Sequence, residues 1–590
     1  MRFQRVLVLL GLASLVAVTL FFLRTRYAPI IPVSQYPNKH NSPSPPVSHP
    51  SPAGADAHPI AQLLSKSKSS WDDVRARQSK TLEEAVREYQ RRYSLPPPPN
   101  FDVWFKFAKA RGVELIDEYD TIYESLLPFW GLQPKMIRDR AKEALGFDNS
   151  LIGVLIRNGA VSLVSGGGDS QEWKRKALEG MMKQFVQYLP NMDLAFNIHD
   201  EPRVVIPSGD LQQLVSHALN VAIPQTANRS AHNAWTSPAD LNGGDRIDEF
   251  KTTRFNRFAH QPTWTTSRSS CPMDTPARDL NEVAPDKIDA YLFGELGFVY
   301  NTTAFSDICL SPSLRYTFGM FERPNAMSIV RDLFPIFAES KVSSFQDILY
   351  PSPWYWSGKV TYEQGPNWDI KKDQMYWRGS TTGGFSRAGG WRRQHRQLFV
   401  KNINAVDDVK VLEKGETNWI TKTVKRSDFK QLFNVSFSHV GQCDPEDCEA
   451  QKSYFDVVKP SPQDEAWEFK YLADVDGNAF SGRFYALLRS RSLVYKLAVF
   501  REWHSEWLRP WVHYIPWSLK GDEHTESVRY FSMEEEGRQH AARVAQESSG
   551  WAKKALKNDA LEAWFFRLLL EYGRVVDDNR DTIGFSLDSP

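Results

Sequence analysis

The sequence predicts an α/β protein with two doubly wound domains. Short apolar runs of strand length alternate with amphipathic helical stretches along most of the chain. The clearest unit is a strand at 471–475, a helix-like segment at 484–491 and a second strand at 492–495, an order that favours a parallel sheet. The chain has 590 residues, 41% of them hydrophobic, which is enough for one or more large cores. Composition therefore excludes a disordered or fibrous protein.

The N-terminal segment has the pattern of a membrane anchor. Residues 6–23 form an apolar run interrupted only by Gly11, Ser14 and Thr19, with arginines on both sides. At 1.5 Å per residue this run is just long enough to cross a bilayer core. A cleaved signal peptide is the alternative, but its apolar region is usually only about 7–15 residues long. We therefore expect a cytoplasmic tail at 1–5, a transmembrane signal-anchor at 6–23 and a lumenal remainder, which is a single-pass type II arrangement.

The next segment has the composition of a stem, and predicted helices and strands follow it. Residues 28–59 hold nine prolines and many serines, a composition that cannot form a core, so we expect a Pro/Ser-rich stem at 24–80. Thr81 and Glu84 form a capping box that opens a helix, which the prolines at 96–99 end. Runs at 152–156 and 161–164 around Asn158-Gly159 predict a hairpin, and 194–197 predicts a buried strand. A second capping box, Ser532 with Glu535, predicts a helix at 532–546, and another helix follows at 559–576.

Charge, cysteines and sequons restrict the compartment and the partners. Lysine plus arginine total 72 and aspartate plus glutamate 71, which leaves no basic field for nucleic acid. The favoured interpretation of the cysteines is two disulfides, Cys271–Cys309 and Cys443–Cys448, in an oxidising compartment; the alternative is four free thiols. Sequons at Asn228, Asn301 and Asn434 predict N-glycosylation. The C-terminus lacks a lumenal retrieval tetrapeptide, so the Golgi membrane is preferred over the endoplasmic reticulum.

Several common catalytic motifs are absent from the sequence. It contains no Walker-type phosphate loop, no Gly-x-Gly-x-x-Gly, no Gly-x-Ser-x-Gly and no His-Glu-x-x-His. The Gly166–Gly168 stretch lacks the lysine of a phosphate loop and is interpreted as a flexible turn. Kinase, dehydrogenase, serine hydrolase and zinc protease functions therefore lose their usual support.

A first candidate site is the stretch 373–384, DQMYWRGSTTGG. A short apolar strand ends at Trp377, and a loop of small residues and then a polar, helix-compatible segment at 387–399 follow it. Loop N–H groups, a helix terminus and a fixed guanidinium together form an anion site. The alternative is a Gly-rich surface turn with a solvated arginine. The candidate residues are Arg378, Gly379, Ser380, Thr381, Thr382 and Gly383.

A second candidate site is the stretch 474–484, DVDGNAFSGRF, between a predicted strand and a predicted helix. Open α/β sheets bind ligands at such positions. Ser481 is a candidate N-cap, and Arg483, followed by Phe484, lies in the first turn, where an arginine opposes the helix dipole unless an anion compensates it. Asp474-x-Asp476 also imitates the metal-binding Asp-x-Asp of many sugar-nucleotide transferases, although two acidic residues at a strand end are common.

A third candidate site is Asp200 in the stretch NIHDEPRV. This aspartate follows an apolar strand and precedes a proline that stops regular structure. A carboxylate at the carboxyl end of a strand, facing a cleft, acts as a general base on a hydroxyl. The alternative is a turn-forming aspartate.

Taken together, these segments resemble glycosyltransferase family 90, which includes fungal capsule-associated transferases and animal protein O-glucosyltransferases. The resemblance covers roughly 81–576 and includes PPPPNFDVWFKFA at 96–108, FQDILYPSPW at 345–354 and WLRPWVHYIP at 507–516. The proline-rich entry and the Arg-Gly-Ser-Thr-Thr-Gly-Gly loop are most similar to the fungal branch. Gly482 departs from the animal pattern, in which serine is next to arginine, and this leaves the role of Ser481 open.

The resemblance implies a GT-B type fold of two Rossmann-like domains with an interdomain cleft. The N-terminal domain, 81–365, would hold the acceptor and the base Asp200. The C-terminal domain, 366–530, would hold a UDP-sugar through Arg378 and Arg483, and helices would follow at 531–590. It also implies that no cofactor or divalent metal is required, and that the acceptor is a glycan, polysaccharide or glycoprotein.

These expectations leave four functional hypotheses. The first is a Golgi, membrane-anchored, inverting transferase that moves xylose or glucose from a UDP-sugar to a glycan or polysaccharide, with UDP-xylose the favoured donor. The second is a protein O-glucosyl- or O-xylosyltransferase. The third is a catalytically inactive carbohydrate-binding protein, which would not need Asp200 together with both arginines. The fourth is a metal-dependent transferase that uses Asp474 and Asp476.

Overall fold

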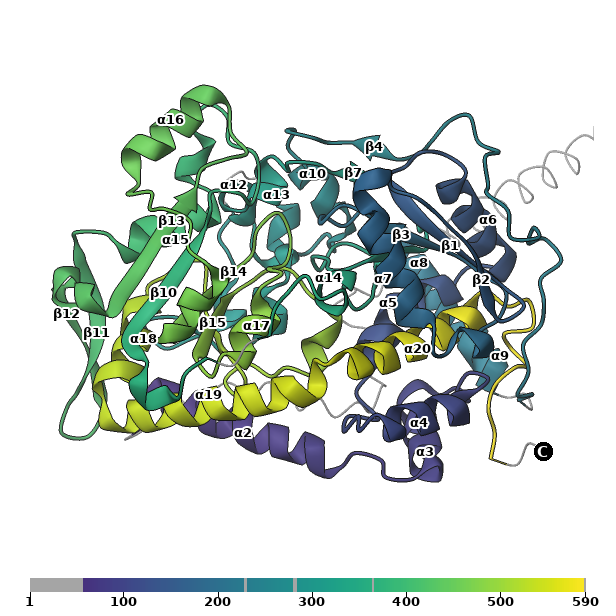
Figure 1. Ribbon diagram of the computed structural model, residues 1–590, viewed down its shortest axis with the longest axis horizontal. Coiled ribbons are helices and arrows are strands. Elements are labelled where there is room, and N and C mark those ends of the chain that lie inside the picture. Colours follow the sequence, from purple (N-terminus) through teal and green to yellow (C-terminus); the bar gives the residue numbers. More distant parts are fainter. Residues whose placement is uncertain (1–56, 228–230, 280–283, 363–364, 588–590) are drawn as a thin grey trace, which may run out of the picture. The chain divides into compact units, whose positions relative to one another are not determined.

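The computed structural model describes residues 57–227, 231–279, 284–362 and 365–587. Two five-stranded sheets dominate these ranges (Figure 1). The first has the order β2-β1-β3-β8-β9 and the second the order β13-β10-β14-β15-β16. Three two-stranded sheets, β4-β7, β5-β6 and β11-β12, accompany them in the described ranges.

The first sheet is mixed rather than doubly wound and parallel. Its strands are β1 (Leu151–Arg157), β2 (Ala160–Gly166), β3 (Met192–Asn197), β8 (Ile336–Ala338) and β9 (Ile348–Leu349). Strand β1 is antiparallel to both β2 and β3, whereas β3, β8 and β9 are parallel. The reason is the predicted hairpin: Asn158 and Gly159 both have positive φ, and a two-residue turn of this kind can join only antiparallel strands.

The second sheet is entirely parallel, as its strand–helix–strand pattern predicted. Its strands are β10 (Lys372–Ser380), β13 (Phe433–His439), β14 (Phe469–Val475), β15 (Leu493–Leu497) and β16 (Ile515–Pro516). Helix α17 (Phe484–Arg489) connects β14 to β15. Tyr376 and Leu472 face one apolar cluster, while Met375 and Tyr471 face another. Both faces of the sheet are therefore buried, which explains its continuous apolar runs.

The remaining elements follow in chain order. The helices are α2 (Pro59–Ala76), α3 (Leu82–Tyr93), α4 (Phe101–Ala110), α5 (Asp120–Trp130), α6 (Pro134–Leu145), α7 (Glu172–Met182), α8 (Ser208–His217), α9 (Ile223–Ala227), α10 (Trp264–Ser267), α11 (Thr302–Phe305), α12 (Leu314–Thr317), α13 (Gly319–Glu322), α14 (Pro353–Trp356), α15 (His395–Ile403), α16 (Pro445–Tyr454), α18 (His524–Met533), α19 (Glu535–Ala555) and α20 (Asn558–Val575). The short strands are β4 (Asn256–Arg257), β5 (Leu292–Phe293), β6 (Phe298–Val299), β7 (Ser328–Ile329), β11 (Asp408–Lys414) and β12 (Trp419–Lys425).

The largest apolar cluster draws side chains from both five-stranded sheets. Phe196 of β3 and Leu472 of β14 belong to it, together with Trp564 of α20. Helix α19 contacts β15 and α17, and α20 contacts α4, α5 and α7 (Figure 1). The two C-terminal helices therefore link the elements around one sheet to the elements around the other.

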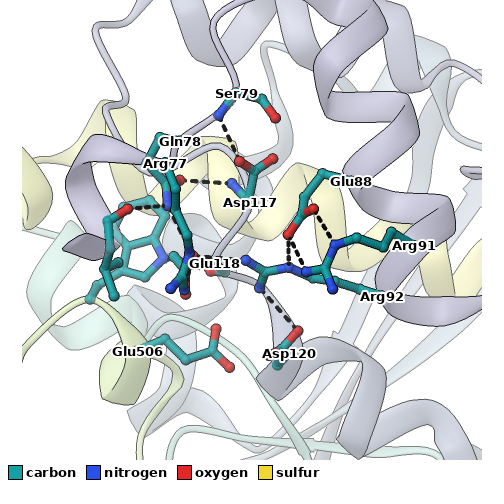
Figure 2. A network of polar contacts seen from close by, with 12 residues as sticks. Arg77, Gln78, Ser79, Glu88, Arg91, Arg92, Asp117, Glu118, Asp120 and Glu506 are labelled. Carbon is teal, nitrogen blue, oxygen red and sulfur yellow. Dashed lines mark hydrogen bonds and ion pairs between the residues drawn. The ribbon is translucent and has the colours of Figure 1, made fainter. Parts of the chain in front are cut away.

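The N-terminal helices are attached to the body by a buried polar network (Figure 2). Arg92 of α3 donates to Glu88 at 2.7 Å and to Glu118 at 2.9 Å, and its side chain is only 2% exposed. Gln78 donates to the same Glu118 oxygen at 2.9 Å. The indole of Trp507 donates to the Glu118 carbonyl oxygen at 2.9 Å, so the network also reaches the 507–516 stretch.

The predicted fold class is wrong in its membrane helix. Among the helices in the described ranges, none combines the length and the apolar character that a bilayer span requires. The segment 6–23, from which the transmembrane helix was predicted, lies outside those ranges, as does most of the stem.

Two further boundaries need correction. The stem was expected to extend to residue 80, but α2 at Pro59–Ala76 places Ile60, Leu63 and Trp71 in the apolar clusters. The helix predicted from a capping box at Ser532 is in fact two: Ser532 lies inside α18, and α19 begins at Glu535. Because α18 continues to Met533, the expected boundary at 530/531 also falls within a helix.

Candidate active site

The first and second candidate sites, 373–384 and 474–484, are called here the two donor motifs. They lie where the strand order of the second sheet reverses. In order along the chain the strands are β10, β13, β14, β15 and β16, so their spatial order is 2-1-3-4-5. In doubly wound sheets of this order, ligands bind beyond the carboxyl ends of strands 1 and 3, which here are β10 and β14. The loop at 381–384 follows β10, and the loop at 476–483 follows β14. The topology thus brings together two motifs that lie about a hundred residues apart in the sequence.

Arg378 lies on β10 itself, because the strand continues to Ser380 rather than ending at Trp377. Its guanidinium donates to the backbone oxygen of Asn434 at 2.8 Å and to the Asn434 side-chain oxygen at 2.6 Å. It also lies 4.6 Å from the centroid of the Tyr376 ring. No carboxylate of the described residues pairs with it, so its positive charge is not neutralised.

Three N–H groups of the loop, those of Thr381, Gly383 and Gly384, donate to oxygen atoms within the protein. Thr381 N donates to the His439 carbonyl oxygen at 3.1 Å. Gly383 N and Gly384 N donate to Asn478 Oδ1 at 3.3 and 3.2 Å. Asn478 belongs to the second motif, so its two hydrogen bonds join the two loops. The cationic groups of the site are the arginines.

Arg483 and Ser481 differ from the expected cap arrangement. Arg483 itself is the N-cap residue of α17, and Ser481 provides no capping bond. Arg483 Nη1 donates to the Arg378 carbonyl oxygen at 2.6 Å, which joins the second motif to the first. Burial lowers the pKa of Arg483, and the negative charge of Asp474 opposes that effect. No ion pair within the described part of the chain neutralises Arg483.

Arg396, in the first turn of α15, was missed by the sequence argument. It donates to Asp476 O at 2.8 Å, Val475 O at 3.0 Å, Ser380 O at 3.2 Å and Thr382 Oγ1 at 3.1 Å. Burial, and then the nearby Arg483, lowers its pKa to about 10. The pattern that identified Arg483 as a candidate applies equally to Arg396, because an arginine in the first turn of a helix opposes the helix dipole.

Asp474 and Asp476 are buried and already have partners. Lys496 Nζ lies 2.9 Å from Asp474 Oδ2, and Asp476 Oδ2 accepts from Val499 N at 2.7 Å and Phe500 N at 3.0 Å. Burial raises the pKa of Asp476 to about 7. Within the described residues, no group of three or more His, Cys, Asp or Glu side chains is arranged to hold a metal ion.

Asp200 follows β3, and its side chain is exposed. The turn that carries it is fixed by Asn197, whose Oδ1 accepts from His199 N at 3.0 Å and whose Nδ2 donates to Glu201 O at 2.7 Å. Surrounding protein raises the pKa of Asp200, Glu339 raises it further, and Lys174 partly offsets both. Solvent therefore reaches the Asp200 carboxylate although protein surrounds it, as expected for a carboxylate in a recess.

A series of contacts runs from the neighbours of Asp200 to the residues beside Arg483. Lys174 pairs with Glu339 at 2.5 Å, and Glu339 accepts a hydrogen bond from Ser352. Next in the chain, Trp354 Nε1 donates to Gly482 O at 3.1 Å, and Tyr355 OH donates to Ser481 O at 2.9 Å. No hydrogen bond or ion pair in the described ranges joins Asp200 directly to Arg378 or Arg483. The catalytic and donor-binding roles of these residues stay predictions.

The structure also places the other residues of interest. It contains both expected disulfides, Cys271–Cys309 and Cys443–Cys448. Asp447, within the second disulfide loop, accepts from Ser386 Oγ at 2.6 Å and Gly389 N at 2.9 Å, so this loop supports the segment after the first donor motif. Asn301 caps α11, Asn434 contacts Arg378, and Asn228 lies outside the described ranges.

The Gly166–Gly168 stretch lines a cavity of about 250 Å³. All three glycines have positive φ. Leu151 and Asn149 at the start of β1 contribute to the lining, and Leu151 pairs with Asn197 at the end of β3. The cavity therefore lies at the same edge of the first sheet as the Asp200 turn.

Comparison with known proteins identifies the class of the C-terminal half. Residues 320–580 match a sequence model of a family of transferases that move sugars. The family is Glycosyl transferase family 90, so the resemblance inferred from the motifs is confirmed for this part of the chain. The match covers both donor motifs and begins after Asp200.

Curated relatives agree with this family. The chain is 24% identical over 263 residues to an O-glucosyltransferase rumi homolog of Aedes aegypti, covering 42% of this chain and 57% of the relative. It is 24% identical over 279 residues to Protein O-glucosyltransferase 1 of Homo sapiens, covering 45% and 64%. It is 24% identical over 212 residues to Protein O-glucosyltransferase 2 of Danio rerio, covering 36% and 34%. The chain thus spans less than two thirds of the length of each of these relatives.

Proposed function

We propose that the protein is an inverting glycosyltransferase that moves a sugar, xylose or glucose, from a UDP-sugar to a hydroxyl of a glycan or polysaccharide. The observation that carries the proposal is the group Arg378, Arg396 and Arg483 at the strand-order reversal of a parallel sheet. None of the three has an ion-pair partner in the described ranges, and burial disfavours the charge on two of them. A bound diphosphate would compensate these charges.

The proposed reaction uses positive groups beside the leaving diphosphate and a carboxylate beside the attacking hydroxyl. As the sugar leaves the diphosphate, negative charge develops on the phosphate oxygens, and guanidinium groups already in place stabilise it. The acceptor hydroxyl attacks from the opposite face of the sugar while Asp200 takes its proton. Surrounding protein raises the pKa of Asp200, which makes this carboxylate a stronger base. A single displacement inverts the anomeric centre.

We further propose that no divalent metal is needed. In its support, Asp474 is paired with Lys496 and Asp476 accepts two backbone N–H bonds, so neither carboxylate needs a cation as partner. Unchanged activity in excess chelator supports this part of the proposal, and activity restored only by Mn²⁺ contradicts it. The two disulfides support an oxidising compartment.

The second candidate is a protein O-glucosyl- or O-xylosyltransferase. The curated relatives, which are named O-glucosyltransferases, favour it. Offering the enzyme a folded protein domain and a polysaccharide as competing acceptors, with the same donor, separates the two candidates.

The decisive experiment measures UDP binding and sugar transfer separately. We expect Asp200→Asn to lower the transfer rate about a thousandfold, in the usual range for a lost general base, and to leave UDP affinity nearly unchanged. Arg483→Ala should weaken UDP affinity. Asp210→Asn and Arg392→Ala are matched controls because both side chains are exposed and lie outside the site. Loss of UDP binding in Asp200→Asn, or unchanged UDP affinity in Arg483→Ala, would contradict the assigned roles.

A further inference from the structure

We propose that Trp354 and Trp173 form the surface on which the donor's sugar ring stacks, and that Gly482 allows Trp354 to take this position. This inference rests on the proposed function and names the residues that contact the transferred sugar. It follows from where the two indoles lie and from what occupies their faces.

Trp354 is held directly beside the second donor motif. It lies in the first turn of α14, where Ser352 Oγ accepts from Trp354 N at 3.1 Å. Its own Nε1 donates to Gly482 O at 3.1 Å, next to Arg483. A Cβ atom built on Gly482 would lie 2.8 Å from that same Nε1. Any side chain at 482 would therefore displace the indole.

Trp173 brings the second indole from the side of Asp200. It lies in the first turn of α7, and its ring meets the Trp354 ring edge-to-face with centroids 5.9 Å apart. The next residue, Lys174, pairs with Glu339 and acts electrostatically on Asp200. The indole pair thus lies between the neighbours of the proposed base and the neighbour of a proposed donor arginine. The transferred sugar must occupy this interval.

The indole pair lies at the protein surface, where a lysine ammonium is its neighbour. Both tryptophans are half-buried, and the exposed Lys359 places its ammonium 4.6 Å from the Trp173 centroid and 5.6 Å from the Trp354 centroid. An electron-rich indole face that attracts an ammonium also attracts the partly positive C–H groups on the apolar face of a pyranose. Xylose and glucose share that face, so the site recognises a pyranose ring rather than one particular sugar.

The test compares the affinities for UDP and for the UDP-sugar that the wild-type protein accepts, both measured by calorimetry. In Trp354→Ala we expect UDP affinity within twofold of wild type and UDP-sugar affinity about tenfold weaker, which equals about 1.4 kcal/mol. Trp354→Phe should recover part of the loss because a ring remains. Gly482→Ala should reproduce the loss with the indole still present. Trp356→Ala removes an indole from the same helix whose Nε1 donates to Glu562, so it is the matched control.

Each other outcome overturns the inference. Equal weakening of UDP and UDP-sugar would mean that the pair is only structural. A raised KM for the acceptor with unchanged donor affinities would assign the pair to the acceptor, and unchanged values throughout would remove it from the site. If the wild-type protein binds neither UDP nor any UDP-sugar, the proposed function fails as well, which distinguishes that failure from the others.

Discussion

Arg396 connects the loop after β10 to the loop after β14, and alanine at this position would leave four oxygen atoms without their guanidinium donor. Asp476 O keeps a second partner in His395 Nε2, and Thr382 Oγ1 keeps one in Ser380. The main loss therefore falls on Val475 O and Ser380 O. Hydrogen bonds from a charged donor contribute about 1.5–3 kcal/mol each, so we expect Arg396→Ala to lower the free energy of unfolding by about 3–6 kcal/mol.

Urea denaturation followed by tryptophan fluorescence measures this loss, and UDP calorimetry measures its effect on the site. Arg396→Lys should fall between wild type and alanine, because an ammonium keeps the charge but not the planar set of donors. Arg392→Ala, a change at an exposed arginine four residues earlier, should shift the free energy by less than about 0.5 kcal/mol. If Arg396→Ala unfolds like Arg392→Ala and binds UDP like wild type, the connecting role assigned to Arg396 is refuted.

Three other predictions concern stability. Serine in place of Cys271 and Cys309, which are 38 residues apart, should cost about 4 kcal/mol, and serine in place of Cys443 and Cys448, 5 residues apart, about 2 kcal/mol; equal losses in urea denaturation would contradict the loop-length argument. Burial, and then Asp200, raises the pKa of Glu201 from 4.5 to about 8, so its contribution to stability is complete below pH 4.5 and is lost as the pH rises through about 8. In Glu201→Gln the urea midpoint should therefore fall less steeply between pH 5 and pH 8. An unchanged slope would contradict the raised pKa of Glu201. Glu118→Ala should cost about 1.5–3 kcal/mol, because the buried Arg92 loses one charged hydrogen bond but keeps Glu88 as a partner. Glu114→Ala, which breaks only partly exposed ion pairs, should cost at most about 1 kcal/mol; similar losses would refute the role of the network in Figure 2.

Periodicity and turn chemistry were sufficient to predict several elements of the fold. Asn158-Gly159 predicted the hairpin, Thr81 with Glu84 predicted the cap of α3, and the apolar run before Asp474 predicted a parallel strand. Periodicity could not show that the first sheet is mixed, since the direction of strand pairing depends on contacts between distant segments. The capping box at Ser532 failed because a turn with no glycine or proline separates α18 from α19 at Glu534.

The candidate site was predictable in its motifs but not in their contacts. The two donor loops could be found because small residues and an arginine follow apolar strands. The pairing of Gly383 and Gly384 with Asn478 could not be foreseen, since it joins segments almost a hundred residues apart. The same holds for Trp173 and Trp354, which meet only because of the tertiary fold.

The position of α2 determines how many N-terminal residues can be removed without exposing the hydrophobic cores. The helix supplies Ile60 and Leu63 to the cluster that covers one face of the second sheet, and Trp71 to the cluster shared by both sheets. Its N-cap, His58, is fully buried, stacks on Tyr530 and contacts Glu526 at 3.0 Å. A shortened chain must therefore begin upstream of residue 58, because a cut near residue 80 would remove a helix from two hydrophobic cores at once.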